Sequence, residues 1–434
     1  MNPELVGLVG ILALLGLIAL RVYIGVAMAV VAFVGIALLN SWDAAWSVLG
    51  MVPFTTGSFY PLSVIPLFVL MGQLVFHSGM SQGVYKAVYG WVGHLPGGLA
   101  IATVIGCAGF SAMCGSSLAT AATMGTAALP EMKRYRYDPA LATGSVAAGG
   151  TLGILIPPSI GFVLYGILTE QSIGRLLMAG ILPGALLTGL YALTIYLLCL
   201  RRPELGPASA KATVGERLSG LGYAWPTLVL FLAVIGGIYA GIFTPIEAAG
   251  VGAFVALGLG LAQRRLSFRA AVRAFAETLR TTAMIFLILV GAEIFTLFLG
   301  LTRLPMTMAD SIASWESPPL VVLVGILCLY VVLGCVLDGL AMIVLTIPVL
   351  FPLIEAMGFD PIWFGVLMMI VLEIGLITPP VGMNVFVIRG VAKDVPLSTI
   401  FRGVVPFIGA SVLAIALILL LPQVALFIPE HMLD

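Results

Sequence analysis

Long apolar segments separated by short polar breaks run through almost the whole sequence, and each is about the length of a helix that crosses a bilayer. Apolar residues make up 61% of the chain and charged residues 9%, whereas a soluble domain has about 25% charged residues. Because backbone polar groups in lipid must be bonded within their own segment, helices are favoured. We therefore predict an all-α polytopic membrane protein in a lipid bilayer, a single integral membrane unit over 1–434. The expected spans are 3–20, 22–39, 58–77, 139–169, 176–200, 223–241, 244–262, 281–300, 361–391 and 403–422.

Charge and motif content exclude two classes of function. The 19 Lys and Arg residues are balanced by 19 Asp and Glu residues, so the chain has no basic surface for nucleic acid. The sequence contains no HExxH, no GxSxG and no Walker A loop, and it is not expected to be an enzyme. Without an ATP site, any transport must be driven by a gradient or served by another subunit.

Two segments do not fit the spanning pattern. The first is centred on Gly115-Ser116-Ser117 and the second on Asp338-Gly339, and each arm of about 17 residues is marginal for a span. Neither centre has a polar stretch typical of a loop. We predict re-entrant helical hairpins over 96–132 and 318–357, with two ordinary short spans at each place as the alternative.

An internal repeat relates these two segments. Sliding the chain by 222 residues without a gap superposes both segments and the prolines around them. We predict two copies of one unit, over 48–200 and 267–425, a pattern typical of secondary transporters. Equivalent positions are Pro96 and Pro318, Ser116 and Asp338, Pro130 and Pro352, Gly153 and Gly375, and Pro157-Pro158 and Pro379-Pro380.

The distribution of Lys and Arg predicts the orientation of the chain. With the N-terminus in the periplasm and each hairpin returning to its own side, 17 of the 19 basic residues lie on one face, which is then cytoplasmic. In this topology the two repeats are inverted, and the hairpins enter from opposite sides. We expect the substrate site between their tips, near the middle of the membrane. Two amphipathic segments, 84–94 and 267–280, are predicted to be interfacial helices on the cytoplasmic surface.

The spans 139–169 and 361–391 each contain a double proline, Pro157-Pro158 and Pro379-Pro380. Proline has no N–H and displaces the preceding residue from the helical conformation, so each helix must break there. A kink that only accommodates packing is the alternative.

A broken helix in a membrane can bind a cation. Carbonyls freed at the end of the first half-helix carry partial negative charge, and sodium accepts such oxygen ligands. These carbonyls lie near Gly153 and Ile156 in the first half and near Gly375 and Thr378 in the second. Side-chain oxygens that can complete two sodium sites belong to Ser116, Ser117, Ser159, Asp338, Thr378 and Asn384.

The hairpin tips can also bind an anion, because the N-terminus of a half-helix presents free amides and positive polarity. We expect a carboxylate substrate to be held by the amides after Ser116 and Asp338 and by nearby polar side chains. The candidate substrate-binding residues are Ser116, Ser117, Thr120, Thr123, Asp338, Gly339 and Asn384. The alternative for the Ser and Thr residues is weak hydrogen bonding between helices.

Three carboxylates lie at membrane depth, where ionisable groups are costly and are functional candidates. Asp338, at a hairpin tip, is expected to take part in the ion or substrate site. Glu293 and Glu373 can be proton sites or satisfied structural groups, and the sequence leaves both alternatives open.

Several separated motifs resemble one known family. They are Gly115-Ser116-Ser117-Leu118-Ala119-Thr120-Ala121-Ala122-Thr123-Met124-Gly125, Pro130-Glu131-Met132, the run 149–158, and Thr378-Pro379-Pro380-Val381-Gly382-Met383-Asn384. Together they resemble the large membrane subunit of tripartite ATP-independent periplasmic (TRAP) transporters, within the ion-transporter superfamily. The resemblance covers residues 5–425.

This resemblance implies a sodium-coupled, elevator-type transporter in the bacterial inner membrane. A small four-helix membrane subunit and a periplasmic substrate-binding protein are the implied partners, and the substrate is expected to be a carboxylate, such as a C4-dicarboxylate or a related organic or sugar acid. By motif position, the implied sodium ligands are Ser116, Ser117, Gly375, Thr378 and Val381. The alternatives are a self-sufficient sodium/carboxylate carrier of the same fold, and a channel.

Overall fold

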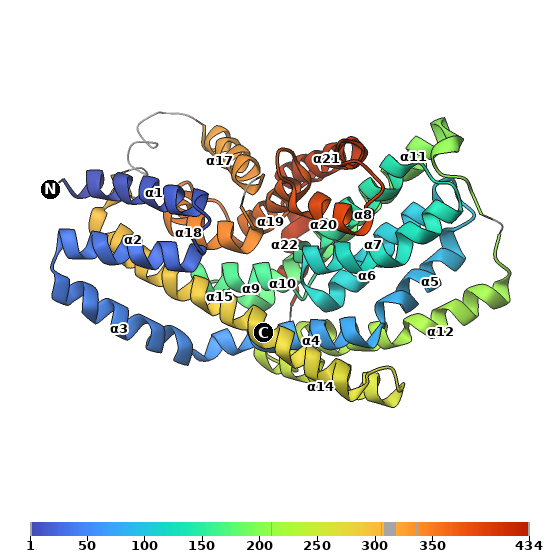
Figure 1. The fold of residues 1–434 in the computed structure, drawn as a ribbon, viewed down its shortest axis with the longest axis horizontal. Helices are drawn as coiled ribbons and strands as arrows, with labels where there is room; N and C mark the ends of the chain where they lie inside the picture. Colours follow the sequence, from blue (N-terminus) through green and yellow to red (C-terminus); the bar gives the residue numbers. More distant parts are fainter. Residues whose placement is uncertain (1, 210, 305, 308–317, 336, 433–434) are drawn as a thin grey trace.

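The protein is described by a computed structural model that places residues 2–209, 211–304, 306–307, 318–335 and 337–432 (Figure 1). Within these residues the chain is helical and forms no strand. Seven helices are long and apolar enough to cross a membrane, and the bent pair α8–α9 can form an eighth span. These features match the predicted multi-pass, all-α membrane protein.

The helices are numbered in chain order. The first half contains α1 (Pro3–Ala19), α2 (Ile24–Leu39), α3 (Trp42–Ser58), η1 (Tyr60–Ser63), α4 (Val64–Ser78), α5 (Ser81–Val92), α6 (Gly98–Cys114), α7 (Ser117–Arg134), α8 (Pro139–Leu155), α9 (Ile160–Leu168), α10 (Ile173–Ala179), α11 (Ile181–Arg201) and η2 (Pro203–Leu205). The second contains α12 (Val214–Phe231), η3 (Leu232–Gly236), α13 (Gly237–Tyr239), α14 (Pro245–Ala262), α15 (Phe268–Thr302), α17 (Pro319–Gly334), α18 (Gly339–Ala356), α19 (Pro361–Ile377), α20 (Met383–Val391), α21 (Leu397–Leu420) and α22 (Gln423–Glu430).

Two helix pairs turn tightly where the sequence predicts hairpin tips. We call α6–α7 the first hairpin and α17–α18 the second hairpin. Only Gly115 and Ser116 separate the two helices of the first hairpin. The second turns between Gly334 and Gly339, where residue 336 lies outside the described residues. The return of each pair to its own membrane face stays a prediction.

Two longer helices are interrupted at the proline pairs. We call α8–α9 the first broken helix and α19–α20 the second broken helix. The first ends its leading half at Leu155 and bends by 40° into α9. The second ends its leading half at Ile377 and resumes at Met383. Both Pro-Pro bonds are cis.

Helix bounds in the two halves follow the offset seen in the sequence. Helices α7 and α18 are offset by 222 residues at both ends, and so are α8 and α19. The N-caps are chemically alike, because Asp138 accepts from two amides of α8 and Asp360 accepts from two amides of α19, at 2.9–3.0 Å. These matches support the repeat, whose inverted topology stays a prediction.

The interior of the molecule is built around the leading halves of the broken helices. Every residue of α8 from Leu141 to Leu155 is buried, and so is every residue of α19 from Ile362 to Ile377. In contrast, α1, α2, α3 and α15 gather at one end of the molecule (Figure 1) and carry exposed apolar side chains such as Leu12, Phe54 and Leu279. An apolar outer surface is what contact with lipid requires.

One expectation about an individual helix differs from the structure. Residues 267–280 do not form a separate interfacial helix, because α15 runs without a break from Phe268 to Thr302. Ser267 caps the start of α15. The helix contains no proline, and its first glycine is Gly291. The predicted spans do not include α3, and α3 is not among the helices long and apolar enough to cross a membrane. Its Ser47 and Ser58 hydroxyls donate to carbonyls four residues earlier, at 2.8 and 2.7 Å, which satisfies them within the helix.

Candidate transport site between the hairpin tips

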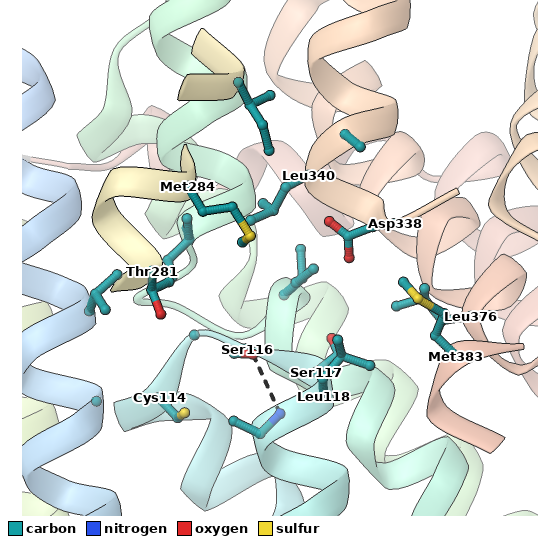
Figure 2. Close-up of a pocket in the computed structure, with 18 of the residues that line it drawn as sticks. Cys114, Ser116, Ser117, Leu118, Thr281, Met284, Asp338, Leu340, Leu376 and Met383 are labelled. Atoms are coloured by element: carbon teal, nitrogen blue, oxygen red, sulfur yellow. Dashed lines mark hydrogen bonds between the residues drawn. The ribbon is translucent and has the colours of Figure 1, made fainter. Parts of the chain in front are cut away.

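A cavity of about 440 Å³ lies between the two hairpin tips. Ser116 and Ser117 line it from the first hairpin, and Asp338 lines it from the second hairpin. Its other walls come from the start of α2, α4 and α15, which supply Tyr23, Gln73 and Thr281 among mainly apolar side chains, and from the residues that border the two helix breaks, Ile154, Ile160, Leu376 and Met383. Figure 2 shows the Asp338 carboxylate and the two serines on different sides of this space, with Thr281 and Met284 on another. The structure thus brings together three of the predicted site residues.

The tip of the first hairpin is shaped by Gly115 and Ser116. Gly115 has φ +62°, and a Cβ at this position would lie 2.6 Å from the carbonyl oxygen of Pro158, so only glycine fits. Ser116 is the N-cap of α7 and its Oγ accepts from the amide of Ala119 at 3.5 Å (Figure 2). The free amides of the first turn of α7 lie at the end of the helix that borders the cavity. Free amides at a helix N-terminus are an arrangement that can bind anions.

The tip of the second hairpin presents a carboxylate where the first presents Ser116. Asp338 precedes α18 and its carboxylate faces the amides of Gly339, Leu340 and Ala341 without completing a capping hydrogen bond. Gly339, the first residue of α18, is buried, and its amide is one of these three. Among the described residues that line the cavity, Asp338 is the only one with a charged side chain.

The first broken helix touches the tip of the first hairpin. A Cβ at Gly153 would lie 2.5 Å from the backbone of Ser116 and Ser117, so Gly153 allows the two backbones to meet. Pro157 has no N–H to offer the Gly153 carbonyl, and Pro158 has none for Ile154. Ser159 replaces one missing donor, because its Oγ donates to the Ile154 carbonyl while it accepts from the amide of Phe162.

Other predicted ligands of the first half point elsewhere. The Ile156 side chain packs against Gly184 on α11 and lines a separate apolar groove. The Thr120 hydroxyl donates to the Ser116 carbonyl at 2.8 Å, and the Thr123 hydroxyl donates to the Ala119 carbonyl at 2.7 Å. Neither threonine lines the cavity, and their roles stay predictions.

The second broken helix reaches the cavity through Leu376 and Met383. Gly375 packs against Gly334, a residue of α17 that precedes the tip. The Thr378 hydroxyl donates to the Ile374 carbonyl at 2.6 Å, and Val381 lies in the interruption without lining the cavity. Asn384 is fully buried, and its Nδ2 donates to the Ala147 carbonyl at 3.3 Å. Its Oδ1 has no hydrogen-bond partner among the described residues.

Glu373 is the site residue whose role the sequence left open. It lies on α19, only 1% exposed, and its Oε1 accepts a hydrogen bond from the Ser117 hydroxyl. The other open carboxylate, Glu293, is exposed and lines a different cavity of about 870 Å³. Sequence reasoning also missed Gln73 and Thr281, for which the only signal was a polar residue in an apolar segment.

The oxygen atoms gathered here fit a hard monovalent cation. The cavity presents hydroxyl, carboxylate and amide oxygens, which are the ligands such ions prefer. No group of three His, Cys, Asp or Glu side chains among the described residues is placed to hold a transition metal. Two buried acceptors, Glu373 Oε2 and Asn384 Oδ1, have no donor within the described structure, as expected of atoms that could face a cation.

Comparisons with known proteins identify the family. The family model for the tripartite ATP-independent periplasmic transporter DctM component matches residues 11–424. A sialic acid TRAP transporter large permease protein of Vibrio cholerae is 34% identical over 420 residues, 96% of each chain. A C4-dicarboxylate TRAP transporter large permease protein of Pseudomonas aeruginosa is 35% identical over 397 residues, 91% of each chain.

A solved structure shows a similar fold. The YdaH transporter of Alcanivorax borkumensis superposes with a TM-score of 0.64 over 97% of this chain and 99% of that one, at 19% identity. The resemblance predicted from the motifs is therefore confirmed at the level of the family. The chain belongs to the DctM component family of tripartite ATP-independent periplasmic transporters, and it is a transporter permease rather than an enzyme.

Proposed function

We propose that this chain is the large permease subunit of a sodium-coupled TRAP transporter that imports a carboxylate, such as a C4-dicarboxylate or a related organic or sugar acid. The observation that carries the proposal is the cavity between the hairpin tips, where Ser116 and Ser117 face Asp338. The two relatives named above transport sialic acid and C4-dicarboxylates by their names, and both substrates carry carboxylates.

The first hairpin offers the binding groups for the substrate. The amides at the start of α7 and the hydroxyl of Ser116 can donate to a carboxylate. Gln73 and Thr281, on the opposite wall, can bond polar groups elsewhere on the molecule. The described lining contains no Lys or Arg, so recognition of the anion relies on neutral donors.

Sodium is needed because Asp338 opposes the binding of an anion. Two like charges about 5 Å apart at an effective dielectric constant of about 20 repel by about 3 kcal/mol, which lowers affinity about 100-fold. A sodium ion beside Asp338 removes this repulsion. Substrate and sodium therefore bind together, and this linkage is the physical basis of symport.

The arrangement of helices supports an elevator-type movement. The two hairpins and two broken helices form the moving unit, and α2, α4 and α15 form the fixed wall. The fixed wall is mainly apolar at the cavity, with Val69, Met284 and Leu287 among its residues. An apolar wall makes few directional bonds that sliding would have to break.

The proposed assembly contains two partners. A small four-helix membrane subunit braces the fixed helices, and a periplasmic substrate-binding protein delivers the acid. The permease lies in the bacterial inner membrane with its N-terminus in the periplasm and its basic loops in the cytoplasm. The exposed apolar faces of α1, α3 and α15 support contact with lipid and with a membrane partner.

Reconstitution tests this function. The permease, its small subunit and its binding protein are placed in proteoliposomes, and uptake of a labelled C4-dicarboxylate and of labelled sialic acid is measured with an inward sodium gradient. We expect uptake that needs all three proteins and the gradient. Uptake that ignores the gradient would refute sodium coupling, and uptake by the permease alone would favour a self-sufficient carrier.

A further inference from the structure

Glu373 differs from every other acidic or basic side chain of the described structure. It is the only Asp, Glu, Lys, Arg or His among the fully buried polar side chains there. Its Oε1 accepts from the Ser117 hydroxyl, and its Oε2 is buried without a hydrogen-bond partner. A carboxylate left half-bonded in the interior of a membrane protein is costly unless a further group completes it.

No cationic side chain among the described residues performs that task. The ion pairs found there, His77 with Glu277 and Lys133 with Asp394, do not involve Glu373. The ionisable groups that act on its carboxyl group electrostatically are Asp338 from the second hairpin and Tyr191 from α11, and neither carries positive charge. Neutralising this carboxylate therefore takes a proton or a cation from outside the described residues.

Three elements meet at Glu373, namely the first hairpin, the end of α8 and α19 itself. Glu373 contacts Ser117 of the first hairpin and lies beside the backbone of Ile154 at the end of α8. Gly153, the preceding residue, has its backbone against Ser116 and Ser117, and its carbonyl faces Pro157, which has no N–H. While Ser117 donates its proton to Glu373, its oxygen lone pairs stay free for a cation.

We propose that Glu373 is a direct ligand of a sodium ion bound at the tip of the first hairpin, together with Ser117 Oγ and the Gly153 carbonyl. This assignment rests on the proposed sodium coupling and deepens it, because it gives one of the two sodium sites a full negative charge. The ion at this site is neutralised by a carboxylate from the other repeat. Sodium thereby joins the first hairpin to the second broken helix.

The test measures sodium binding apart from transport. Purified wild-type permease and the variant Glu373→Gln are titrated with sodium chloride in nanodiscs, with choline chloride keeping ionic strength constant, and the sodium-dependent rise in melting temperature gives the apparent affinity. Glutamine keeps the acceptor for Ser117 but removes the charge. We expect sodium affinity to fall about 10- to 100-fold, as for the loss of a group that supports a metal site.

Glu293→Gln is the matched control, because it makes the same chemical change at an exposed carboxylate in the other cavity. Its sodium affinity should equal that of the wild type. If Glu373→Gln does not fold, Glu373→Asp replaces it, and this variant should bind sodium more weakly than the wild type. Unchanged sodium affinity in the Glu373 variant that folds overturns the assignment and leaves sodium coupling intact. A wild-type protein that ignores sodium overturns both.

Discussion

The hydroxyl of Ser117 donates a hydrogen bond to Oε1 of Glu373, a residue 256 positions later in the chain. This bond connects the tip of the first hairpin to the leading half of the second broken helix. Because both residues are buried, the bond is protected from water, and neither group has another side-chain partner among the described residues. The bond is thus a direct contact between the two predicted repeats.

Ser117→Ala should destabilise the protein by about 2 kcal/mol, because it leaves the buried carboxyl group of Glu373 without its hydrogen-bond donor. The measurement is thermal unfolding in nanodiscs. Ser116→Ala is the matched control, since its hydroxyl accepts one long capping bond of 3.5 Å and lies partly exposed, and it should cost less. An equal loss of stability in the two variants would show that the hydrogen bond to Glu373 contributes no more than the capping bond of Ser116.

Gly153→Ala should lower the rate of uptake. The added Cβ would lie 2.5 Å from the backbone of Ser116 and Ser117, which cannot give way as a flexible side chain can. We expect overpacking to cost about 1–3 kcal/mol and to displace the tip from the cavity. Uptake and melting temperature are measured together. Gly189→Ala, where a Cβ meets nothing within 4 Å, should behave as the wild type, and a similar result for Gly153→Ala would contradict the close contact.

Tyr137→Phe tests the anchoring of the first hairpin at its base. The Tyr137 hydroxyl accepts from the buried amide of Leu99 at 3.1 Å and donates to the Pro207 carbonyl at 3.1 Å. Removing it leaves a buried amide without an acceptor, which costs about 1–3 kcal/mol. We expect a lower melting temperature at neutral pH. An unchanged melting temperature would mean that the hydrogen bonds of Tyr137 to Leu99 and to Pro207, in the loop after α11, do not stabilise the first hairpin.

The same hydroxyl predicts a dependence on pH. Burial raises the pKa of Tyr137 from its ordinary value of 10.0 to about 12, so the folded protein keeps this proton while the unfolded chain releases it. Its contribution to stability is complete below about pH 10 and is lost as the pH rises toward 12. Unfolding measured across this range should show a smaller decline in Tyr137→Phe than in the wild type.

Local chemistry made part of this structure predictable. Proline pairs and Gly115 act on their own backbone, so the breaks after Leu155 and Ile377 and the turn before α7 can be read from single residues and their neighbours. The bond between Ser117 and Glu373 cannot, because it depends on the packing of two distant segments. The apolar groove that Ile156 lines, the cavity of about 870 Å³ that Glu293 lines, and the presence of Gln73 and Thr281 at the site depend on packing in the same way.

Hydropathy failed at one boundary for a different reason. Helix α15 passes from a charged segment into an apolar one, and the change of composition predicts a boundary that the backbone does not have. Composition describes the environment of a segment, and it does not set where the helix stops.

The most direct test of the cavity's role is equilibrium binding of a labelled C4-dicarboxylate or sialic acid to the purified permease with its small subunit, with and without sodium, in the wild type and in Asp338→Asn. The wild type should require sodium, because Asp338 otherwise repels the substrate. The Asp338→Asn variant should bind in its absence and lose most of the sodium dependence, which is about 100-fold by the estimate of like-charge repulsion. Wild-type binding that ignores sodium, or a variant that keeps the full dependence, would contradict this account.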